Sequence, residues 1–184
     1  MIAILSQLLS GVEILTLNNF PSQEEPEETG STYAENATIK AEHAASHTGE
    51  WCIADDAGLE IDALGGAPGL YSKRFGGEET PFPAKMSMIL ESLGDRADRA
   101  ARFRCCIALA KSGHPTQVIE EICEGQIALE PSGGGGFGYD PIFWLPGLNC
   151  TMADLTAEQK HAISHRGKVL RRFAHLYAGV INSP

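Results

Sequence analysis

Residues 51–63 read Trp51-Cys52-Ile53-Ala54-Asp55-Asp56-Ala57-Gly58-Leu59-Glu60-Ile61-Asp62-Ala63. The apolar run at 51–54 predicts a short buried strand that delivers two aspartates at its C-terminal end. Apolar and acidic residues then alternate over 59–63, which predicts a second, half-buried strand. Strands of this kind among amphipathic helices indicate an α/β fold.

The Asp55-Asp56-Ala57-Gly58 segment is the first candidate for chemistry. Adjacent strand residues point to opposite faces, so one aspartate can enter a cleft while the other holds the local backbone. A carboxylate in this position suits a magnesium ligand or a general base. The alternative is an ordinary Asp-Gly turn capped by side chains.

Helices and strands are predicted on both sides of this stretch. Upstream we expect a helix fragment over residues 1–10, a strand over 12–17, a loop over 18–30 and a helix from Thr32 to about His47. Thr32 and Glu35 form a capping-box pattern, and Gly49 follows the helix. Downstream we expect a turn at 65–69, a helix at 83–93, a hairpin of 103–110 with 117–123 and a strand at 125–129. A short helix after Thr156 and a longer helix from Ser164 follow. The buried stripe of the longer helix is expected to be Val169, Leu170, Phe173, Leu176 and Tyr177.

Composition and charge exclude several classes of protein. The 184 residues suit one domain, residues 1–184, and the 43% hydrophobic share is ordinary for a globular chain. A formal net charge of −10 argues against binding to nucleic acid. Five cysteines without a CxxC pair predict a reduced, cytoplasmic protein. No apolar stretch is long enough for a membrane span, and the first residues do not have the pattern of a signal peptide.

Two polar segments upstream of the aspartates can serve a polyphosphate. The run Glu24-Glu25-Pro26-Glu27-Glu28 is typical of a solvated face, yet a carboxylate here can share a metal with Asp56. Asn36 and Lys40 lie on one face of the helix that begins near Thr32. Lys40 can be a point charge for a phosphate, and Asn36 can fix a loop or a sugar.

The segment Gly133-Gly134-Gly135-Gly136-Phe137-Gly138-Tyr139-Asp140-Pro141 is the most unusual in the chain. It contains GxGxxG, but a dinucleotide fingerprint needs a helix directly after the glycines, and no Gly-Lys-Ser/Thr follows as in a P-loop. Glycines let the backbone approach a flat or charged ligand, so Phe137 and Tyr139 can stack on a base. The alternative is a flexible hairpin tip.

A basic cluster opens the last helix, in the run Ser164-His165-Arg166-Gly167-Lys168. Ser164 is a predicted N-cap, and the N–H groups of a first helical turn favour an anion. Cations are mildly unfavourable at a helix N-terminus unless an anion is near, so Arg166 and Lys168 indicate an anion site. Lys160, on the preceding short helix, can join this cluster.

These motifs occur in a fixed order together with Glu28-Thr29-Gly30, Glu35-Asn36-Ala37, Lys40-Ala41 and Gly65-Gly66-Ala67-Pro68-Gly69. The ordered set resembles the inosine/xanthosine triphosphate pyrophosphatases, a Ham1-like family, in their bacterial form. The resemblance implies hydrolysis of ITP, dITP and XTP to the monophosphate and pyrophosphate, which cleans the nucleotide pool. It also implies Mg2+ dependence, a homodimer, and a Ham1/Maf-like α/β fold whose mixed twisted sheet is flanked by helices, with a cleft between two lobes.

The resemblance also assigns residues by position. Asp56 matches the catalytic acidic residue, and Glu27 with Asp56 matches the metal-associated carboxylates. The residues that match substrate-binding positions, taken with the two suggested above from the helix that begins near Thr32, are Ala57, Phe137, Gly138, Tyr139, Asp140, Lys160, His165, Arg166, Lys40 and Asn36. A site that donates hydrogen bonds to the 6-oxo group of hypoxanthine or xanthine discriminates against adenine, because its donors stay unpaired against an amino group.

Two departures from the family pattern bear on activity. The family begins with a strand and a Thr/Ser-x-Asn-x-x-Lys turn that holds the triphosphate, whereas this sequence opens on the helix that follows, so we expect the first strand to be missing. Ala57 also replaces the usual serine. We therefore expect weak triphosphate binding and slow turnover. The alternative functions are a nucleotide-binding or dimer-scaffold protein without turnover and, less well matched, a dinucleotide-dependent oxidoreductase.

Overall fold

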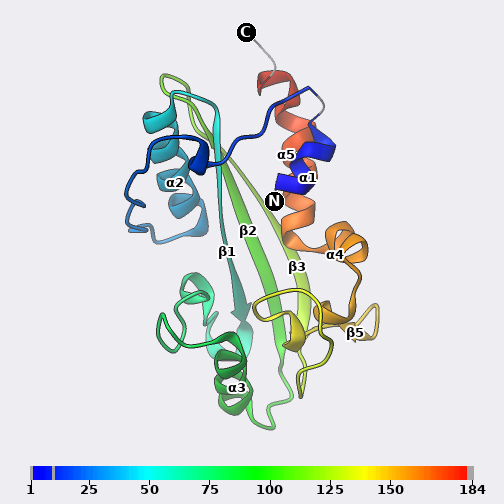
Figure 1. The fold of residues 1–184 in the computed structure, drawn as a ribbon. Helices are drawn as coiled ribbons and strands as arrows, with labels where there is room; N and C mark the ends of the chain where they lie inside the picture. Colours follow the sequence, from blue (N-terminus) through cyan, green and yellow to red (C-terminus); the bar gives the residue numbers. More distant parts are fainter. Residues whose placement is uncertain (1, 10, 182–184) are drawn as a thin grey trace. The chain divides into compact units, whose positions relative to one another are not determined.

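The computed structural model describes residues 2–9 and 11–181 as an α/β protein with one sheet (Figure 1). The sheet has five strands in the order β1 to β5, and its strands pair antiparallel. Trp144 of β4, for example, lies opposite Gln126 of β3 and Thr151 of β5. The strands are β1 (Cys52–Ile61), β2 (Ala100–Ala110), β3 (Gln117–Ile127), β4 (Phe143–Leu145) and β5 (Cys150–Thr151). The expected α/β class with a sheet and helices is confirmed, and the described sheet is antiparallel where a mixed one was expected.

Five α-helices accompany the sheet in the described residues. They are α1 (Ile2–Leu8), α2 (Tyr33–Thr48), α3 (Phe82–Leu93), α4 (Ala157–Ile163) and α5 (His165–Ile181). All five correspond to helices predicted from the sequence. None of the described helices is long and apolar enough to cross a bilayer.

The chain divides into two compact units. Unit 1 contains the residues up to Asp56, the segment Cys105–Glu121 and the chain from Arg166 onward. Unit 2 contains Ala57–Arg104 and Ile122–His165. Each unit is described below by itself.

In unit 1, helix α2 has the predicted boundaries for the predicted reasons. The hydroxyl of Thr32 accepts a hydrogen bond from the backbone N–H of Glu35, and Gly49 ends the helix in the left-handed conformation with φ of 73°. The Glu35 carboxylate reaches back to the N–H and hydroxyl of Ser31, one residue earlier than a standard capping box. Small alanines on the buried face, among them Ala37 and Ala41 with no exposed surface, let α2 pack closely.

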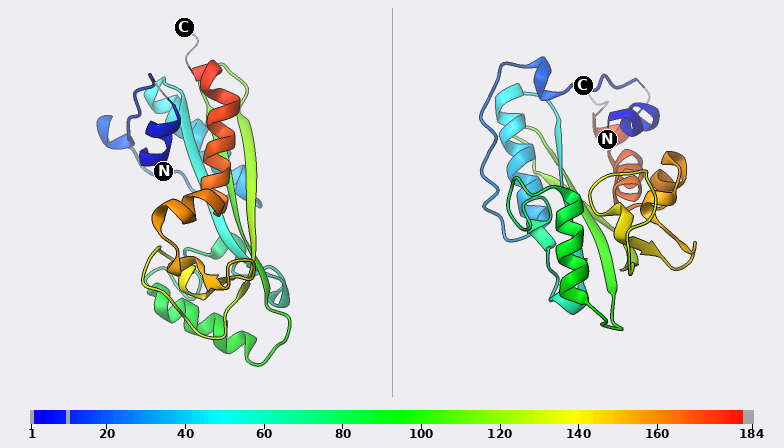
Figure 2. Two further views of the ribbon diagram at one scale, coloured as in Figure 1. Left: turned by 90° about the vertical axis from the view of Figure 1, so that its right-hand side faces the viewer. Right: turned by 60° about the horizontal axis from the view of Figure 1, so that its bottom comes forward.

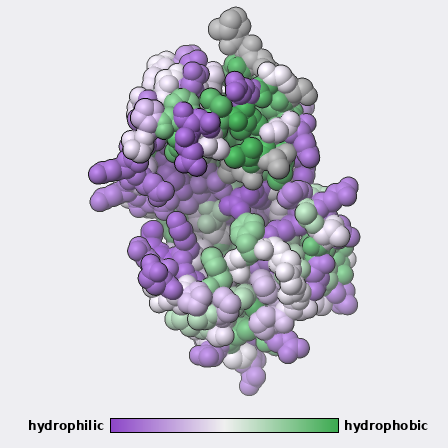
Figure 3. Space-filling view, in the orientation of Figure 1, coloured by the Kyte–Doolittle hydropathy of each residue, from purple (hydrophilic) through white to green (hydrophobic). Residues whose placement is uncertain are grey.

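Helix α1 lies beside α5 in unit 1, as three views show (Figures 1 and 2). Apolar side chains gather on the surface in this region (Figure 3), and Ile2, Leu8 and Val180 are exposed there. Leu176 of α5, which the sequence pattern placed in the buried stripe, is 47% exposed; that prediction was wrong. Ala174 is buried in its place, because the buried face of α5 follows Val169, Leu170 and Phe173.

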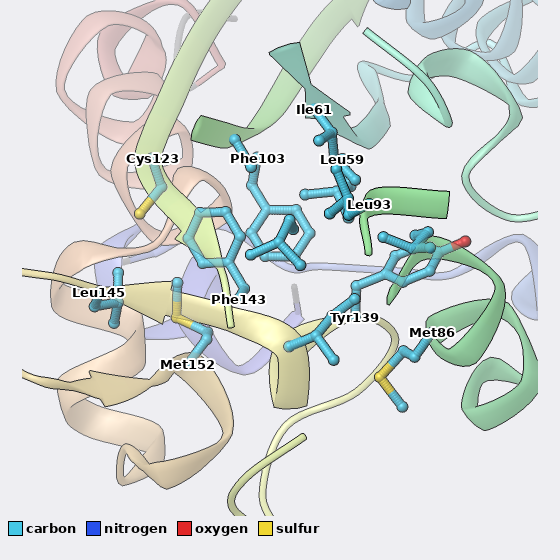
Figure 4. Close-up of a cluster of buried hydrophobic side chains, with 14 residues drawn as sticks. Leu59, Ile61, Met86, Leu93, Phe103, Cys123, Tyr139, Phe143, Leu145 and Met152 are labelled. Carbon is cyan, nitrogen blue, oxygen red and sulfur yellow. The ribbon is translucent and has the colours of Figure 1, made fainter. Parts of the chain in front are cut away.

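Unit 2 contains a cluster of buried apolar side chains that forms a core (Figure 4). It joins the end of β1, the start of β2, the end of β3, the segment 139–152 and helix α3. The rings of Phe103 and Phe143 meet at its centre, 4.3 Å apart between centroids. Helix α3 contributes the spaced residues Met86, Ile89 and Leu93, which is the helical pattern expected for one buried face.

The strand predicted at residues 12–17 is not present. Residues 12–16 have irregular backbone, and a short 3-10 helix follows at Leu17–Asn19. The side-chain oxygen of Asn19 accepts hydrogen bonds from the N–H and hydroxyl of Thr16, 2.9 and 3.1 Å long. Residues 12–16 belong to none of the strands of the described sheet, and along them partly buried and exposed residues alternate.

Two predicted strand breaks are also absent. Residues 52–61 form one continuous strand, so Asp55 and Asp56 lie in the middle of β1, and the prediction of two separate strands with the aspartates at the end of the first was wrong. β3 likewise runs unbroken to Ile127 through Gly125. A Cβ at position 125 would lie 2.6 Å from the Phe143 ring and the Trp144 carbonyl. Glycine therefore allows the close approach of β4 to β3 and does not end the strand.

Candidate functional site

The centre of the candidate site in unit 1 is a pair of carboxylates that share one lysine. The Lys40 ammonium lies 2.8 Å from Glu28 Oε1 and 3.2 Å from Asp56 Oδ1. Lys40 comes from α2, Asp56 from the middle of β1 and Glu28 from the acidic loop. The side chains of Lys40 and Asp56 are largely buried, so water screens their charges only in part. The structure thus brings together Asp56, Lys40 and Glu28.

Asn36 anchors this cluster from one turn earlier in α2. Its side chain is 1% exposed; its Nδ2 donates to Asp56 Oδ2 over 3.3 Å, and its Oδ1 accepts from the Gly30 N–H over 2.8 Å. A Cβ at Gly30 would lie 2.6 Å from Asn36 Oδ1, so glycine lets the acidic loop come this close. Asn36 therefore holds both the loop that carries Glu28 and the carboxylate of Asp56.

The environment shifts the protonation of both partners. Burial raises the pKa of Asp56 above the ordinary carboxyl value, and the charge and hydrogen bond of Lys40 offset this only in part. Burial works against the charge of Lys40, but the hydrogen bond to Glu28 and the charges of Asp56 and Glu28 raise the Lys40 pKa. A carboxylate with a raised pKa is a stronger base, and it gains from any further cation placed near it.

A second ion pair lies next to the first in the sequence. The Arg166 guanidinium, in the first turn of α5, donates to Asp55 Oδ2 from Nη2 over 2.8 Å and from Nε over 3.2 Å. The Cys105 sulfur lies 3.9 Å from the same oxygen. Burial, together with the charge of Asp55, raises the pKa of the Cys105 thiol, which favours its protonated form. The sequence predicted an anion near Arg166 at the start of the last helix. In this structure, the Asp55 carboxylate is that anion.

The remaining predicted residues of this region are placed as follows. Ala57 continues β1 directly after Asp56 and is partly exposed. Glu27 lies exposed in the acidic loop, and its carbonyl accepts the N–H of Thr29. The carboxylate that shares Lys40 with Asp56 is that of Glu28, one residue further on.

In unit 2, the predicted base-binding loop is built around a buried aspartate. Asp140 is 2% exposed, and its Oδ2 accepts the backbone N–H of Phe137 over 2.6 Å. The same oxygen accepts a charge-assisted hydrogen bond from Lys160 Nζ, which comes from α4. Asp140 thus closes the loop on itself and fixes Lys160 against it.

Phe137 and Lys160 form the exposed part of this loop. The Phe137 side chain is 63% exposed, and the Lys160 ammonium lies 4.2 Å from the centre of its ring. An exposed aromatic ring with a cation at one face is a suitable surface for a planar, electron-rich ligand. The role of these two residues as ligand contacts stays a prediction.

Tyr139 and His165 have more interior positions. Tyr139 is 3% exposed, its hydroxyl donates to the Ser72 carbonyl over 2.8 Å, and burial raises its pKa to about 12. The His165 ring stacks on Phe103 with 4.8 Å between centroids and 25° between planes. The structure therefore shows Tyr139 as an anchor of the loop, a role that its neighbouring glycines did not reveal.

Gly136 allows a test of the loop geometry. Its φ is +74°, and a Cβ would lie 2.1 Å from Asp140 Oδ2, so alanine strains the backbone and pushes Asp140 from its partners. We expect Gly136→Ala to lower the free energy of unfolding by about 2–3 kcal/mol, measured by urea denaturation. Gly134→Ala is the matched control: a Cβ there meets nothing within 4 Å, and we expect a change below about 0.5 kcal/mol. Equal losses in the two variants would show that the Asp140 contact does not hold the loop.

The family model described as the Ham1 family matches residues 1–176. This chain belongs to the Ham1 family. Among proteins similar to this Ham1 chain are the dITP/XTP pyrophosphatases of Geobacillus kaustophilus, 45% identical over 173 residues, and of Exiguobacterium sibiricum, 48% identical over 164 residues. These alignments cover 93% and 88% of this chain and 85% and 83% of the relatives.

Solved structures give the same result. The HAM1 protein from Coxiella burnetii has a TM-score of 0.90 and 42% identity, with 96% of this chain and 92% of that chain covered. The Staphylococcus aureus Ham1 protein has a TM-score of 0.80 and 44% identity, covering 84% and 80%. The fold expected from the ordered motifs is therefore confirmed at the level of the family.

Sequence reasoning missed three residues of these Ham1 clusters. Glu28 was part of an acidic run whose members the sequence alone does not distinguish. Asp55 was assigned only to the local backbone, yet it binds Arg166. Phe103 gave no signal beyond an apolar position in β2, yet its ring holds His165. Only the position of Glu28 directly before Thr29-Gly30, ahead of a capped helix, could have suggested its role.

Proposed function

We propose that this Ham1 chain hydrolyses non-canonical purine nucleoside triphosphates (dITP, XTP and ITP) to the monophosphate and pyrophosphate. The observation that carries the proposal is the largely buried Asp56 carboxylate, held by Asn36 and Lys40 and given a raised pKa by burial. Relatives that cover most of the chain at 45–48% identity are named dITP/XTP pyrophosphatases. The reaction removes damaged nucleotides from the precursor pool.

Asp56 is the proposed catalytic residue. Its raised pKa suits a general base that accepts the proton of the attacking water. Lys40 donates hydrogen bonds to Asp56 and Glu28, so it can hold Asp56 in place and place positive charge near a phosphate oxygen. Asn36 keeps the carboxylate oriented through its amide, and the Asn36 amide is in turn held by the Gly30 N–H.

The donors of unit 1 fit Mg2+ as the proposed metal. The described residues contain no group of three or more His, Cys, Asp or Glu side chains that could hold a metal alone. Magnesium needs only one or two carboxylates when phosphate oxygens and water complete its shell. Asp56 and Glu27 are the ligands that the resemblance indicates, and Glu28 is the acidic neighbour that shares Lys40. When bound, the ion would neutralise phosphate charge and polarise the bond that breaks.

Arg166 is the proposed contact for the negative charge of the substrate. Its guanidinium is held by Asp55 through two nitrogens to one oxygen, which fixes the direction of the planar fork. Lys40 and Arg166 thus supply two cationic groups in a chain with a formal charge of −10. Local positive charge of this kind is what an acidic protein needs to bind a polyphosphate.

The proposed base contacts lie in unit 2. Phe137 is the ring on which a purine stacks, and Lys160, held by Asp140, is a donor for a 6-oxo group. Gly138, Tyr139, His165 and Ala57 complete the proposed set. An adenine, with an amino group at position 6, would leave a buried donor unpaired, which is why such a site rejects it.

The proposal is tested by substrate and metal dependence. We expect pyrophosphate release from dITP in the presence of Mg2+, with kcat/KM at least about 100-fold higher for dITP than for dATP. EDTA should abolish the release and added Mg2+ should restore it. Equal rates on dITP and dATP, or turnover that EDTA leaves intact, would count against the proposed chemistry.

Several expectations beyond the reaction also stay proposals. Four of them rest on the resemblance and on the sequence: the homodimer, the cytoplasmic location, a single domain over residues 1–184, and the reduced activity expected with Ala57 in place of serine. Light scattering of the purified chain measures the oligomeric state directly. The Ala57→Ser variant measures the effect of the missing hydroxyl on KM.

A further inference from the structure

Lys85 is an unusual charged residue in unit 2. It lies in α3 with 1% of its surface exposed and is among the largest fully buried side chains. Lysine is almost never fully buried unless its charge is paired. Here the ammonium donates to the Lys73 carbonyl and lies 5.2 Å from the centre of the Phe82 ring. Lys85 forms no ion pair with a carboxylate of the described residues, 2–9 and 11–181. Its charge is therefore compensated by a backbone carbonyl and the face of an aromatic ring.

The Lys73 carbonyl belongs to a segment that also binds the predicted base-binding loop, residues 137–140, called the base loop below. The preceding carbonyl, that of Ser72, accepts the Tyr139 hydroxyl over 2.8 Å. The Ser72 hydroxyl accepts the N–H of Leu59 over 2.9 Å and donates to the Gly69 carbonyl over 2.6 Å. Two successive carbonyls are thus bound from two sides, one by α3 through Lys85 and the other by the loop through Tyr139.

Helix α3 reaches the loop by a second route. The Phe82 ring meets the Tyr139 ring edge-on, with 5.2 Å between centroids and 87° between planes. A Cβ at Gly138 would lie 3.6 Å from the Phe82 ring, so the loop backbone also packs against it. Figure 4 shows Tyr139 close to Met86 of α3 within the same core. Phe82, Lys85 and the Ser72–Lys73 backbone therefore form one socket for Tyr139.

We propose that Lys85 is a positioning residue for the base loop. It fixes the Ser72–Lys73 backbone as an acceptor for Tyr139, and Tyr139 fixes the direction in which Phe137 and Gly138 face a ligand. This role needs a long side chain that donates a hydrogen bond to the Lys73 carbonyl. Methionine has a similar volume but no N–H group, so it cannot replace lysine here. The inference rests on the proposed function in one respect, that this loop contacts the base of the substrate.

The test compares Lys85→Met with Lys73→Met. Lys73→Met removes the same charge from an exposed side chain and keeps the backbone carbonyl that Lys85 binds. In the ligand-free protein, we expect hydrogen exchange at the amides of residues 137–139 to be about tenfold faster in Lys85→Met and within about twofold of wild type in Lys73→Met. With dITP, we expect Lys85→Met to raise KM about three- to tenfold and to change kcat by less than about twofold.

Tyr139→Phe tests the other end of the network. This substitution removes one hydroxyl and keeps the ring, so it should raise KM and the hydrogen-exchange rate of the loop amides as Lys85→Met does. In the double variant, the fold-changes in KM and in exchange rate should be smaller than the product of the fold-changes of the two single variants. Should Lys85→Met fail to fold, Tyr139→Phe alone decides, by the same two readouts. Unchanged exchange and KM, or independent effects in the double variant, would overturn the positioning role. Failure of the proposed function would appear separately, as no pyrophosphate release by the wild type, while hydrogen exchange would still test the socket.

Discussion

The Asp56→Asn variant is expected to lose about 10²- to 10⁴-fold in kcat for dITP, the range typical of a removed general base. Asparagine keeps the shape of the side chain, and its one amide oxygen can replace one of the two oxygens that accept from Lys40 and Asn36. It has no charge with which to accept a proton from water or to attract a cation. Pyrophosphate release at saturating dITP and Mg2+ measures the loss, and the effect should be on kcat more than on KM.

Asp62→Asn is the matched control for this variant. Asp62 is also an aspartate bound by a basic side chain, since Arg102 donates to both of its oxygens over 2.8 and 2.9 Å, but its side chain is 41% exposed. We expect its kcat to stay within about twofold of wild type, because a surface ion pair contributes little. A similar loss of kcat in both variants would mean that Asp56 acts through stability and not through the reaction.

The Asp140→Asn variant is expected to lose about 3–5 kcal/mol of the free energy of unfolding, because it leaves the largely buried Lys160 ammonium without its counter-charge. For a chain of this size the melting temperature should fall by on the order of 10 °C. KM for dITP should rise as well, since Asp140 also accepts the Phe137 N–H. Thermal denaturation with and without dITP measures both effects.

A second substitution separates charge from shape. Adding Lys160→Met to Asp140→Asn removes the unpaired cation, so the double variant should recover more than half of the lost stability while KM stays raised. The two substitutions should therefore be strongly non-additive in stability. Additive losses would show that the Asp140–Lys160 pair does not account for the rigidity of the loop.

Local signals in the sequence predicted the helices well. The capping pattern at Thr32 and the glycine at 49 place both ends of α2, and Thr156 with Gln159 begins α4 as expected. Their hydrogen bonds are made within a few residues, so sequence alone contains them. The sequence placed Asn36 and Lys40 on one face of α2, but it did not predict the ion pair of Lys40 with Asp56 in β1.

Other features depend on partners far away in the sequence. β1 continues through Asp55-Asp56 although the composition there is typical of a turn, because the pairing of β1 with β2 outweighs local propensity. Tyr139 is buried because Ser72, 67 residues earlier, accepts its hydroxyl. Lys85 lies in a predicted helix, and only the folded position of the Lys73 carbonyl explains its burial. Such contacts leave no trace in a local pattern.

Nuclear magnetic resonance of the phosphorus products of dITP shows which phosphoanhydride bond the protein cleaves and whether Asp56 is needed. With Mg2+ and the wild-type chain, we expect dIMP and pyrophosphate in equal amounts, and at least about 100-fold slower formation of both with Asp56→Asn. Orthophosphate together with dIDP, or pyrophosphate formed as fast by Asp56→Asn as by wild type, would contradict it.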